Sequence, residues 1–345
     1  MKVSVIGAGP SGCIAAASAA IESHCVVVYE EHRKIGFPVQ CGGLLSRTAI
    51  NWFGGLGVDC KSTIINTISG WRIFCGKTQL SIRSNEPKAY VVRRHAFDQA
   101  CADFAERNGA KIEMNARLGP REIKKLSTSS FVIGADGPFS TVAETFSFPP
   151  IKKYAVAYQS DVTDLSLGSE KNIVKVYLYG KSFGWLIPLN EERARAGMLF
   201  FSDPRVRIYN HFLDILGKET GKNLMTRGMF SDCIPVSIRP RIQVGKICLV
   251  GDAAGQVKPT SGGGVYYGCK SAWLAGKTLD SGDYEKRWRK EIGKDLGSHI
   301  VIRKLANALN RKSIELILRL APLFGIDRMF ARYDMEKISS IFGFN

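Results

Sequence analysis

The sequence lacks the patterns by which several protein classes are recognised. Its nine cysteines include no CxxC pair, so neither a zinc site nor a dithiol redox motif is indicated, and no bound metal is expected. Scattered cysteines in a long chain are typical of a reduced cytosolic protein rather than of a disulfide framework. No apolar run approaches the ~18 residues that a membrane-spanning helix requires. Zinc-finger, RNP and basic-zipper patterns are also missing, so nucleic acid is not an expected partner.

What the chain has in excess is positive charge. Its 345 residues carry a formal net charge of +17, with 45% hydrophobic and 23% charged residues. The length and composition predict a globular protein with room for two domains. The charge favours an acidic partner, such as an anionic membrane surface, an acidic protein or a phosphorylated substrate. We therefore expect a cytoplasmic protein, with the inner face of a membrane as a second location.

The N-terminus carries a dinucleotide-binding fingerprint. A short apolar run leads into Gly7, Gly9 and Gly12, a helix is expected at 14–21, and the next apolar run ends at Glu30. The first glycine allows a tight turn, the second lets a pyrophosphate approach the backbone, and the third lets the helix pack closely. The helix N-terminus offers N–H groups to phosphates, and the acid can accept hydrogen bonds from a ribose. A dinucleotide cofactor is therefore predicted.

A second motif, near residue 250, suits the other end of such a cofactor. An apolar strand at 247–250 runs into Gly251-Asp252 and two alanines, and three glycines at 262–264 open a helix expected over 264–280. Asp252 can accept a hydrogen bond from a ribityl hydroxyl, and the alanines are small enough to lie under a flat ring. The glycine-rich helix start can stabilise negative charge on a reduced flavin. This motif therefore indicates a flavin.

Between these motifs lie Arg94, which precedes a helix expected over 96–108, and a buried strand at 130–135 that ends in Asp136-Gly137. Taken in order, the four features resemble the FAD-containing aromatic-hydroxylase superfamily over about residues 1–282. The resemblance implies FAD as the cofactor. It implies cofactor contacts at Gly7, Gly9, Pro10, Ser11, Gly12, Glu30, Cys41, Gly42, Arg94, Leu118, Asp252, Gly262, Gly263, Gly264 and Val265.

Two further segments resemble the geranylgeranyl reductase family within this superfamily. Residues 38–43 read Pro-Val-Gln-Cys-Gly-Gly, and residues 183–188 read Phe-Gly-Trp-Leu-Ile-Pro, with Gly197 beyond. The family has Tyr and Phe where this chain has Phe183 and Ile187. Hydroxylases place a histidine where this chain has Gly255, which favours the reductase branch. The 185–188 segment also overlaps a halogenase motif, so a flavin-dependent monooxygenase or halogenase is the alternative.

The resemblance implies reduction of an isolated carbon–carbon double bond in an isoprenoid lipid, with hydride from reduced FAD. Cys41 is the candidate catalytic residue, either tuning the flavin or delivering a proton, and its alternative role is packing. An apolar substrate pocket is expected along the sheet, walled by Tyr177, Tyr179, Phe183, Trp185 and Pro188. Lys258 is expected to be a solvated surface lysine. No second nucleotide fingerprint is present, so electrons are expected from an acidic carrier such as ferredoxin, with NAD(P)H as the alternative donor.

The predicted fold is α/β, a Rossmann-type FAD-binding domain with an inserted antiparallel-sheet domain and a helical C-terminal tail. Segments 1–55, 93–150 and 240–282 are assigned to the cofactor domain, segments 56–92 and 151–239 to the sheet domain, and 283–345 to the tail. The tail interleaves basic residues with apolar ones such as Ile314, Ile317, Leu318 and Leu320. Such a helix can lie on an anionic bilayer or pack its apolar side on the core.

Overall fold

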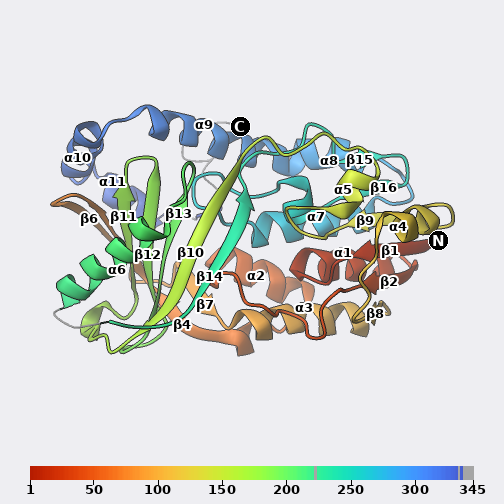
Figure 1. The fold of residues 1–345 in the computed structure, drawn as a ribbon, viewed down its shortest axis with the longest axis horizontal. Coiled ribbons are helices and arrows are strands. Elements are labelled where there is room, and N and C mark those ends of the chain that lie inside the picture. Colours follow the sequence, from red (N-terminus) through yellow and green to blue (C-terminus); the bar gives the residue numbers. More distant parts are fainter. Residues whose placement is uncertain (221–223, 333–334, 337–345) are drawn as a thin grey trace.

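The computed structural model describes residues 1–220, 224–332 and 335–336, and places two large sheets side by side (Figure 1). The first sheet has six strands in the order β15-β16-β9-β1-β2-β8, parallel except between β15 and β16. All of them come from the three segments assigned to a cofactor domain. Their bounds are β1 (Lys2–Ile6), β2 (Cys25–Tyr29), β8 (Lys111–Glu113), β9 (Phe131–Gly134), β15 (Gln243–Val244) and β16 (Ile247–Leu249).

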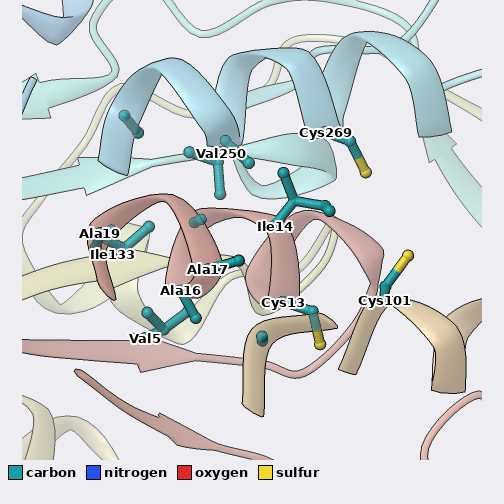
Figure 2. Packing of buried hydrophobic residues seen from close by; sticks show 14 of the residues in the cluster. Val5, Cys13, Ile14, Ala16, Ala17, Ala19, Cys101, Ile133, Val250 and Cys269 are labelled. Carbon is teal, nitrogen blue, oxygen red and sulfur yellow. The ribbon is translucent and has the colours of Figure 1, made fainter. Parts of the chain in front are cut away.

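Helix α1 (Pro10–Ile21) lies between this sheet and α7 (Val265–Lys277), as Figure 2 shows around Val5 and Cys269. The helix is rich in fully buried alanines, which allow close packing on both sides. A Cβ on Gly276 of α7 would lie only 2.6 Å from the Cβ of Ser18 in α1. The helix begins at Pro10 rather than at residue 14, because the fixed φ of proline suits the first helical turn.

Smaller elements surround the two large sheets, and strands β4 and β7 share a core with β11 (Ile173–Tyr179) and β12 (Ser182–Pro188) of the second one. A three-stranded sheet has the order β3-β7-β4. The bounds are β3 (Leu44–Ser46), β4 (Ile64–Ile68), β7 (Ala89–Val92), α2 (Arg47–Leu56), η1 (Lys61–Thr63), α3 (Arg94–Arg107), α4 (Pro120–Ser127), α5 (Thr141–Thr145) and η3 (Gly251–Ala254). The expected α/β class is therefore confirmed.

The second large sheet has seven strands in the order β14-β10-β13-β12-β11-β5-β6, antiparallel except between β11 and β5. Its elements are β5 (Gly70–Cys75), β6 (Thr78–Arg83), β10 (Tyr154–Thr163), β11 (Ile173–Tyr179), β12 (Ser182–Pro188), β13 (Ala194–Phe200) and β14 (Met225–Pro235), with η2 (Gly168–Glu170) and α6 (Val206–Thr220). Tyr209 and Phe212 of α6 are buried against one face of the sheet. The opposite face is free to form a cavity wall.

The tail is helical, with α8 (Tyr284–Trp288), η4 (Arg289–Gly293), α9 (Lys294–Ala308), α10 (Arg311–Leu320) and α11 (Ile326–Arg332). Tyr284 and Trp288 are buried in the same core as the first sheet, and Leu318 is buried against β5 and β6. One side of these helices therefore packs on the protein. Residues 333–334 and 337–345, which we also expected in the helical tail, lie outside the described residues.

Candidate active site

The glycine turn after β1 has the geometry that a pyrophosphate site needs. Gly7 has φ +100°, and a Cβ there would lie 2.5 Å from the carbonyl oxygen of Ala135. A Cβ on Gly12 would lie 1.9 Å from the carbonyl oxygen of Gly7, so this position holds α1 against the turn and does not line the cavity. A Cβ on Gly9 would meet no atom within 4 Å. Because Gly9 lines the cavity, a side chain there would occupy space that a ligand could fill.

Glu30 and Leu118 line an adjoining cavity, which Gly9 also lines. One carboxylate oxygen of Glu30 accepts a hydrogen bond from the Ala8 N–H at 2.7 Å, and the other accepts one from the His32 N–H at 3.0 Å. The His32 ring nitrogen lies 2.6 Å from that second oxygen. These bonds fix a buried acid at the end of β2, beside the glycine turn, where a ribose diol would meet it.

The cavity first described at the Gly9 turn is also lined by Pro10, Ser11, Arg94 and Asp252. Arg94 binds the carboxylate of Asp98 through two nitrogens, at 3.0 and 3.1 Å. Burial opposes the charge of Arg94, but Asp98 and Cys41 outweigh it and raise the pKa of the guanidinium above its ordinary value. Arg94 is therefore a fixed cation in the cavity wall.

Asp252 enters the cavity from the turn after β16. Burial raises the pKa of its carboxyl to about 6; the neighbouring Asp232 adds to the shift and Arg94 opposes it. A Cβ on Gly264 would lie 3.1 Å from an Asp252 carboxylate oxygen. Gly264 is also the N-cap of α7, where no side chain caps the helix. The acid and the uncapped helix start thus face the same space.

Three adjoining cavities follow one another along the molecule. The first holds the glycine turn, Glu30 and Leu118; the second shares Gly9 with it and adds Arg94 and Asp252. The second and third share seven residues: Gln40, Cys41, Asp232, Ile234, Gly262, Gly264 and Val265. Gly42 and Gly263 line the third cavity. Every residue expected at the cofactor, except Gly12, therefore lines this path, and the arrangement fits an extended dinucleotide.

The loop that carries Cys41 is held by the sheet domain. Arg195 of β13 donates to the carbonyl oxygen of Gly42 at 3.1 Å and to that of Cys41 at 3.5 Å, and its Nε binds Asp161 at 3.0 Å. The Gly43 N–H donates to the Cys41 sulfur at 3.4 Å. Cys41 therefore occupies a fixed position where the second and third cavities meet.

The third cavity is apolar on the side formed by the seven-stranded sheet. Its wall contains Trp71, Val174, Val176, Phe183, Trp185 and Ile187. Trp185 lies over Gly197 of the adjacent strand, where a Cβ would be 2.3 Å from the indole. The cavity therefore joins the Cys41 loop and the start of α7 to a hydrophobic chamber.

Three residues expected in this wall lie elsewhere. Tyr177 stacks on Phe74 with ring centroids 4.8 Å apart, and its hydroxyl donates to Glu219 of α6 at 2.7 Å. Tyr179 shares that face, with its ring 6.4 Å from that of Phe212. Pro188 does not line the chamber either. Successive side chains of a strand point to opposite faces of the sheet. These three side chains therefore lie on the face opposite to that of Val176, Trp185 and Ile187.

Sequence reasoning missed Asp232 and Gln40, and it misplaced Lys258. Asp232 is half-buried on β14, and burial raises the pKa of its carboxyl. Lys258 is only 5% exposed and forms an ion pair with Glu336 at 2.9 Å, so the expectation of a solvated lysine is wrong. Asp232 has no motif around it, and Lys258 is buried by a residue distant in sequence. Neither position could be read from local pattern.

Comparison with known proteins agrees with this geometry. Residues 1–281 match the family model described as FAD binding domain. The chain belongs to this family. Its cofactor is FAD, as the residues along the three cavities predicted, and it is an FAD-dependent oxidoreductase.

Proteins similar to this chain include named reductases and solved structures of the same fold. Digeranylgeranylglycerophospholipid reductase of Methanothrix thermoacetophila is 28% identical over 352 residues, covering 88% of this chain and 86% of that protein. A geranylgeranyl bacteriochlorophyll reductase-like crystal structure from Thermoplasma acidophilum has a TM-score of 0.79 at 21% identity, covering 98% of this chain and 93% of the other. A flavin-dependent brominase has a TM-score of 0.71 at 14% identity, covering 96% and 93%. The two structures show the fold alone, whereas the named relative confirms the resemblance to geranylgeranyl reductases.

No helix in the described part of the chain is long and apolar enough to cross a membrane.

Proposed function

We propose that this protein is an FAD-dependent reductase that saturates carbon–carbon double bonds of geranylgeranyl or other polyprenyl chains. The substrate would be a membrane ether lipid or a prenyl diphosphate. One observation carries the proposal: a hydrophobic chamber opens directly onto the Cys41 loop and the triple-glycine start of α7. The names of curated relatives in several methanogenic archaea agree with it.

When bound and reduced, FAD supplies hydride to one carbon of the double bond. The protein would contribute by orienting the alkene at the cofactor and by excluding water, because an isolated alkene has no carbonyl that the protein could polarise. Phe183, Trp185 and Ile187 would hold the chain of the substrate against the sheet and exclude water. The uncapped N-terminus of α7 would stabilise negative charge that develops at the cofactor edge.

The other alkene carbon needs a proton, which the chain itself can provide. Of the seven residues shared by the second and third cavities, Cys41 and Asp232 have side chains whose acid form can donate a proton. Burial raises the pKa of Asp232, which retains its proton to higher pH. Either residue would give its proton to the alkene and recover one from solvent. Electrons would reach the cofactor from an acidic carrier such as ferredoxin or from NAD(P)H, and the net charge of +17 suits the former.

The proposal is tested with the purified holoprotein under anaerobic conditions. Dithionite-reduced enzyme is incubated with a digeranylgeranyl ether lipid and, separately, with geranylgeranyl diphosphate. The product should gain about 2 Da for each double bond reduced. Oxidised enzyme without dithionite is the control. Absence of any mass gain with both substrates would contradict the proposal. Incorporation of oxygen or halide under air with NAD(P)H would instead support the monooxygenase or halogenase alternative.

A further inference from the structure

Helix α10 is apolar on two sides, and only one of them packs on the protein. Leu318 is 7% exposed, and Ile314 lies beside it against Cys75, Leu80 and Ile82 of β5 and β6. The other side carries Leu316, Ile317 and Leu320, which are 56%, 47% and 38% exposed. Core packing therefore explains only half of the apolar residues of this helix.

The outward stripe continues into the loop between α10 and α11. Leu323 and Phe324 are 79% and 75% exposed, the highest values among the large hydrophobic side chains that the structure describes. We call the set Leu316, Ile317, Leu320, Leu323 and Phe324 the α10–α11 surface. Its members are spaced by about one helical turn along α10 and end in the highly exposed pair Leu323 and Phe324. Exposed apolar groups gathered in this way mark an interaction site.

Positive charge surrounds the α10–α11 surface. Residues 301–328 contain six basic and two acidic residues. Lys312, Arg319 and Arg328 are exposed, and none of them forms an ion pair with any residue that the structure describes. Of the two acids, Glu315 is bound to Arg311 at 2.8 Å, and Asp327 is half-buried. The uncompensated charge around the apolar stripe is therefore positive.

We propose that the α10–α11 surface docks this protein on an anionic membrane. Leu323 and Phe324 would enter the boundary between headgroups and acyl chains, while Lys312, Arg319 and Arg328 would contact lipid phosphates. An apolar stripe flanked by free cations is the arrangement by which amphipathic helices lie in a bilayer interface. Two adjacent apolar side chains as exposed as Leu323 and Phe324 suit a fluid acyl layer, which adapts its shape to them. The inference goes beyond the proposed function, because docking does not require the reductase reaction.

The two alternatives left open for the basic tail, a helix on a bilayer and a helix packed on the core, apply to different faces of α10. Ile314 and Leu318, which looked equivalent to Ile317 and Leu320 in the sequence, point into the protein. The tip at Leu323 and Phe324 was not among the residues that we expected to reach lipid. The proposal is therefore confined to one face of α10 and the loop that follows it.

The test is co-sedimentation of the full-length holoprotein with vesicles of phosphatidylcholine, with and without phosphatidylglycerol. Affinity should rise steeply with the anionic lipid and fall with added salt. Replacing Leu323 and Phe324 by serine should weaken binding at least about tenfold. These side chains are exposed, so the variant should keep its thermal midpoint and its bound flavin.

The matched charge experiment compares two double variants of equal net charge. Lys312→Gln with Arg319→Gln removes two cations from the α10–α11 surface and should weaken binding about thirtyfold, at roughly tenfold per 1.4 kcal/mol. Lys124→Gln with Lys125→Gln removes two exposed cations from α4, at the opposite end of the molecule (Figure 1), and should have little effect. Equal binding to neutral and anionic vesicles would overturn the proposal, as would equal losses in the two double variants.

Another outcome would also overturn the proposal. If Leu323→Ser with Phe324→Ser changes the elution volume on size exclusion but leaves vesicle binding intact, the surface joins protein copies instead. Failure of prenyl reduction with intact vesicle binding would refute the proposed function alone. Loss of vesicle binding with intact reduction of a detergent-dispersed substrate would refute docking alone.

Discussion

Replacement of Gly197 by alanine tests how the hydrophobic chamber is built. Gly197 on β13 pairs with Trp185 on β12, and a Cβ there would lie 2.3, 2.4 and 2.9 Å from three atoms of the indole. Ordinary contact begins near 3.4 Å, so the indole would have to move by about 1 Å. Gly197 has no positive φ, so the substitution introduces no backbone strain, and its unfavourable effect comes from this contact.

The magnitude follows from overpacking and from backbone entropy. Inserting a methyl group into a filled site costs about 1–3 kcal/mol, because the neighbouring side chain must leave its position. In a Trp185→Ala background the same methyl has room. Alanine is there expected to stabilise the strand by about 0.5–1 kcal/mol relative to glycine. Because the entropic gain is present in both backgrounds, it cancels in the cycle, and the two substitutions should be coupled by about 1–3 kcal/mol, the cost of overpacking.

The assay is a double-mutant cycle of urea unfolding on the holoprotein, at one FAD concentration and with bound flavin measured by absorbance. Gly197→Ala alone should destabilise, and Gly197→Ala added to Trp185→Ala should not. Bound flavin should be unchanged in all four proteins, because neither residue lines the cofactor end of the path. Additive effects of the two substitutions would refute the contact and, with it, the position of Trp185 in the chamber wall.

Three further predictions concern the cofactor side. Gly9→Leu should leave the apoprotein folded but weaken FAD binding at least about tenfold, since its side chain enters ligand space; flavin absorbance and thermal unfolding measure both. The raised pKa of Asp252, about 6, means that the folded apoprotein retains a proton there that the unfolded chain releases near pH 4. Its contribution to stability is therefore present below pH 4 and is lost, by up to about 3 kcal/mol, as pH rises through 6; Asp252→Asn should remove that part of the urea-unfolding profile, and an unchanged profile would contradict it. Asp232→Asn should slow alkene reduction and shift its pH profile without changing FAD affinity, and an unaltered rate would leave Cys41 as the proton donor.

The cofactor side of the fold was predictable because its information is local. Strand, glycine turn, helix and terminal acid follow one another within the first thirty residues, so the spacing of Gly7, Gly9 and Gly12 identifies the turn even though Gly7 also packs on the distant Ala135. The Asp252 motif is local in the same way. Its glycines and the start of the following helix could be predicted without any information about the sheet domain.

The chamber wall was harder to predict because both faces of the second sheet are covered. One face packs on α6 and the other borders the cavity, so both sets of alternating residues are apolar or aromatic. Tyr177 and Trp185 therefore look alike as candidates, and the sequence contains nothing that assigns them to faces. The same ambiguity applies to α10, where Leu318 is buried and Ile317 is exposed.

The position of Cys41 depends on both parts of the molecule at once. Its loop follows β2 of the cofactor sheet, yet Arg195 of the other sheet holds the carbonyl oxygens of Cys41 and Gly42. Charge-assisted hydrogen bonds from a guanidinium that Asp161 also fixes are stronger and more directional than neutral ones. A shift of the sheet would therefore move the Cys41 loop with it. The thiol and the chamber would keep their spacing, which the proposed delivery of hydride and proton to adjacent carbons would require.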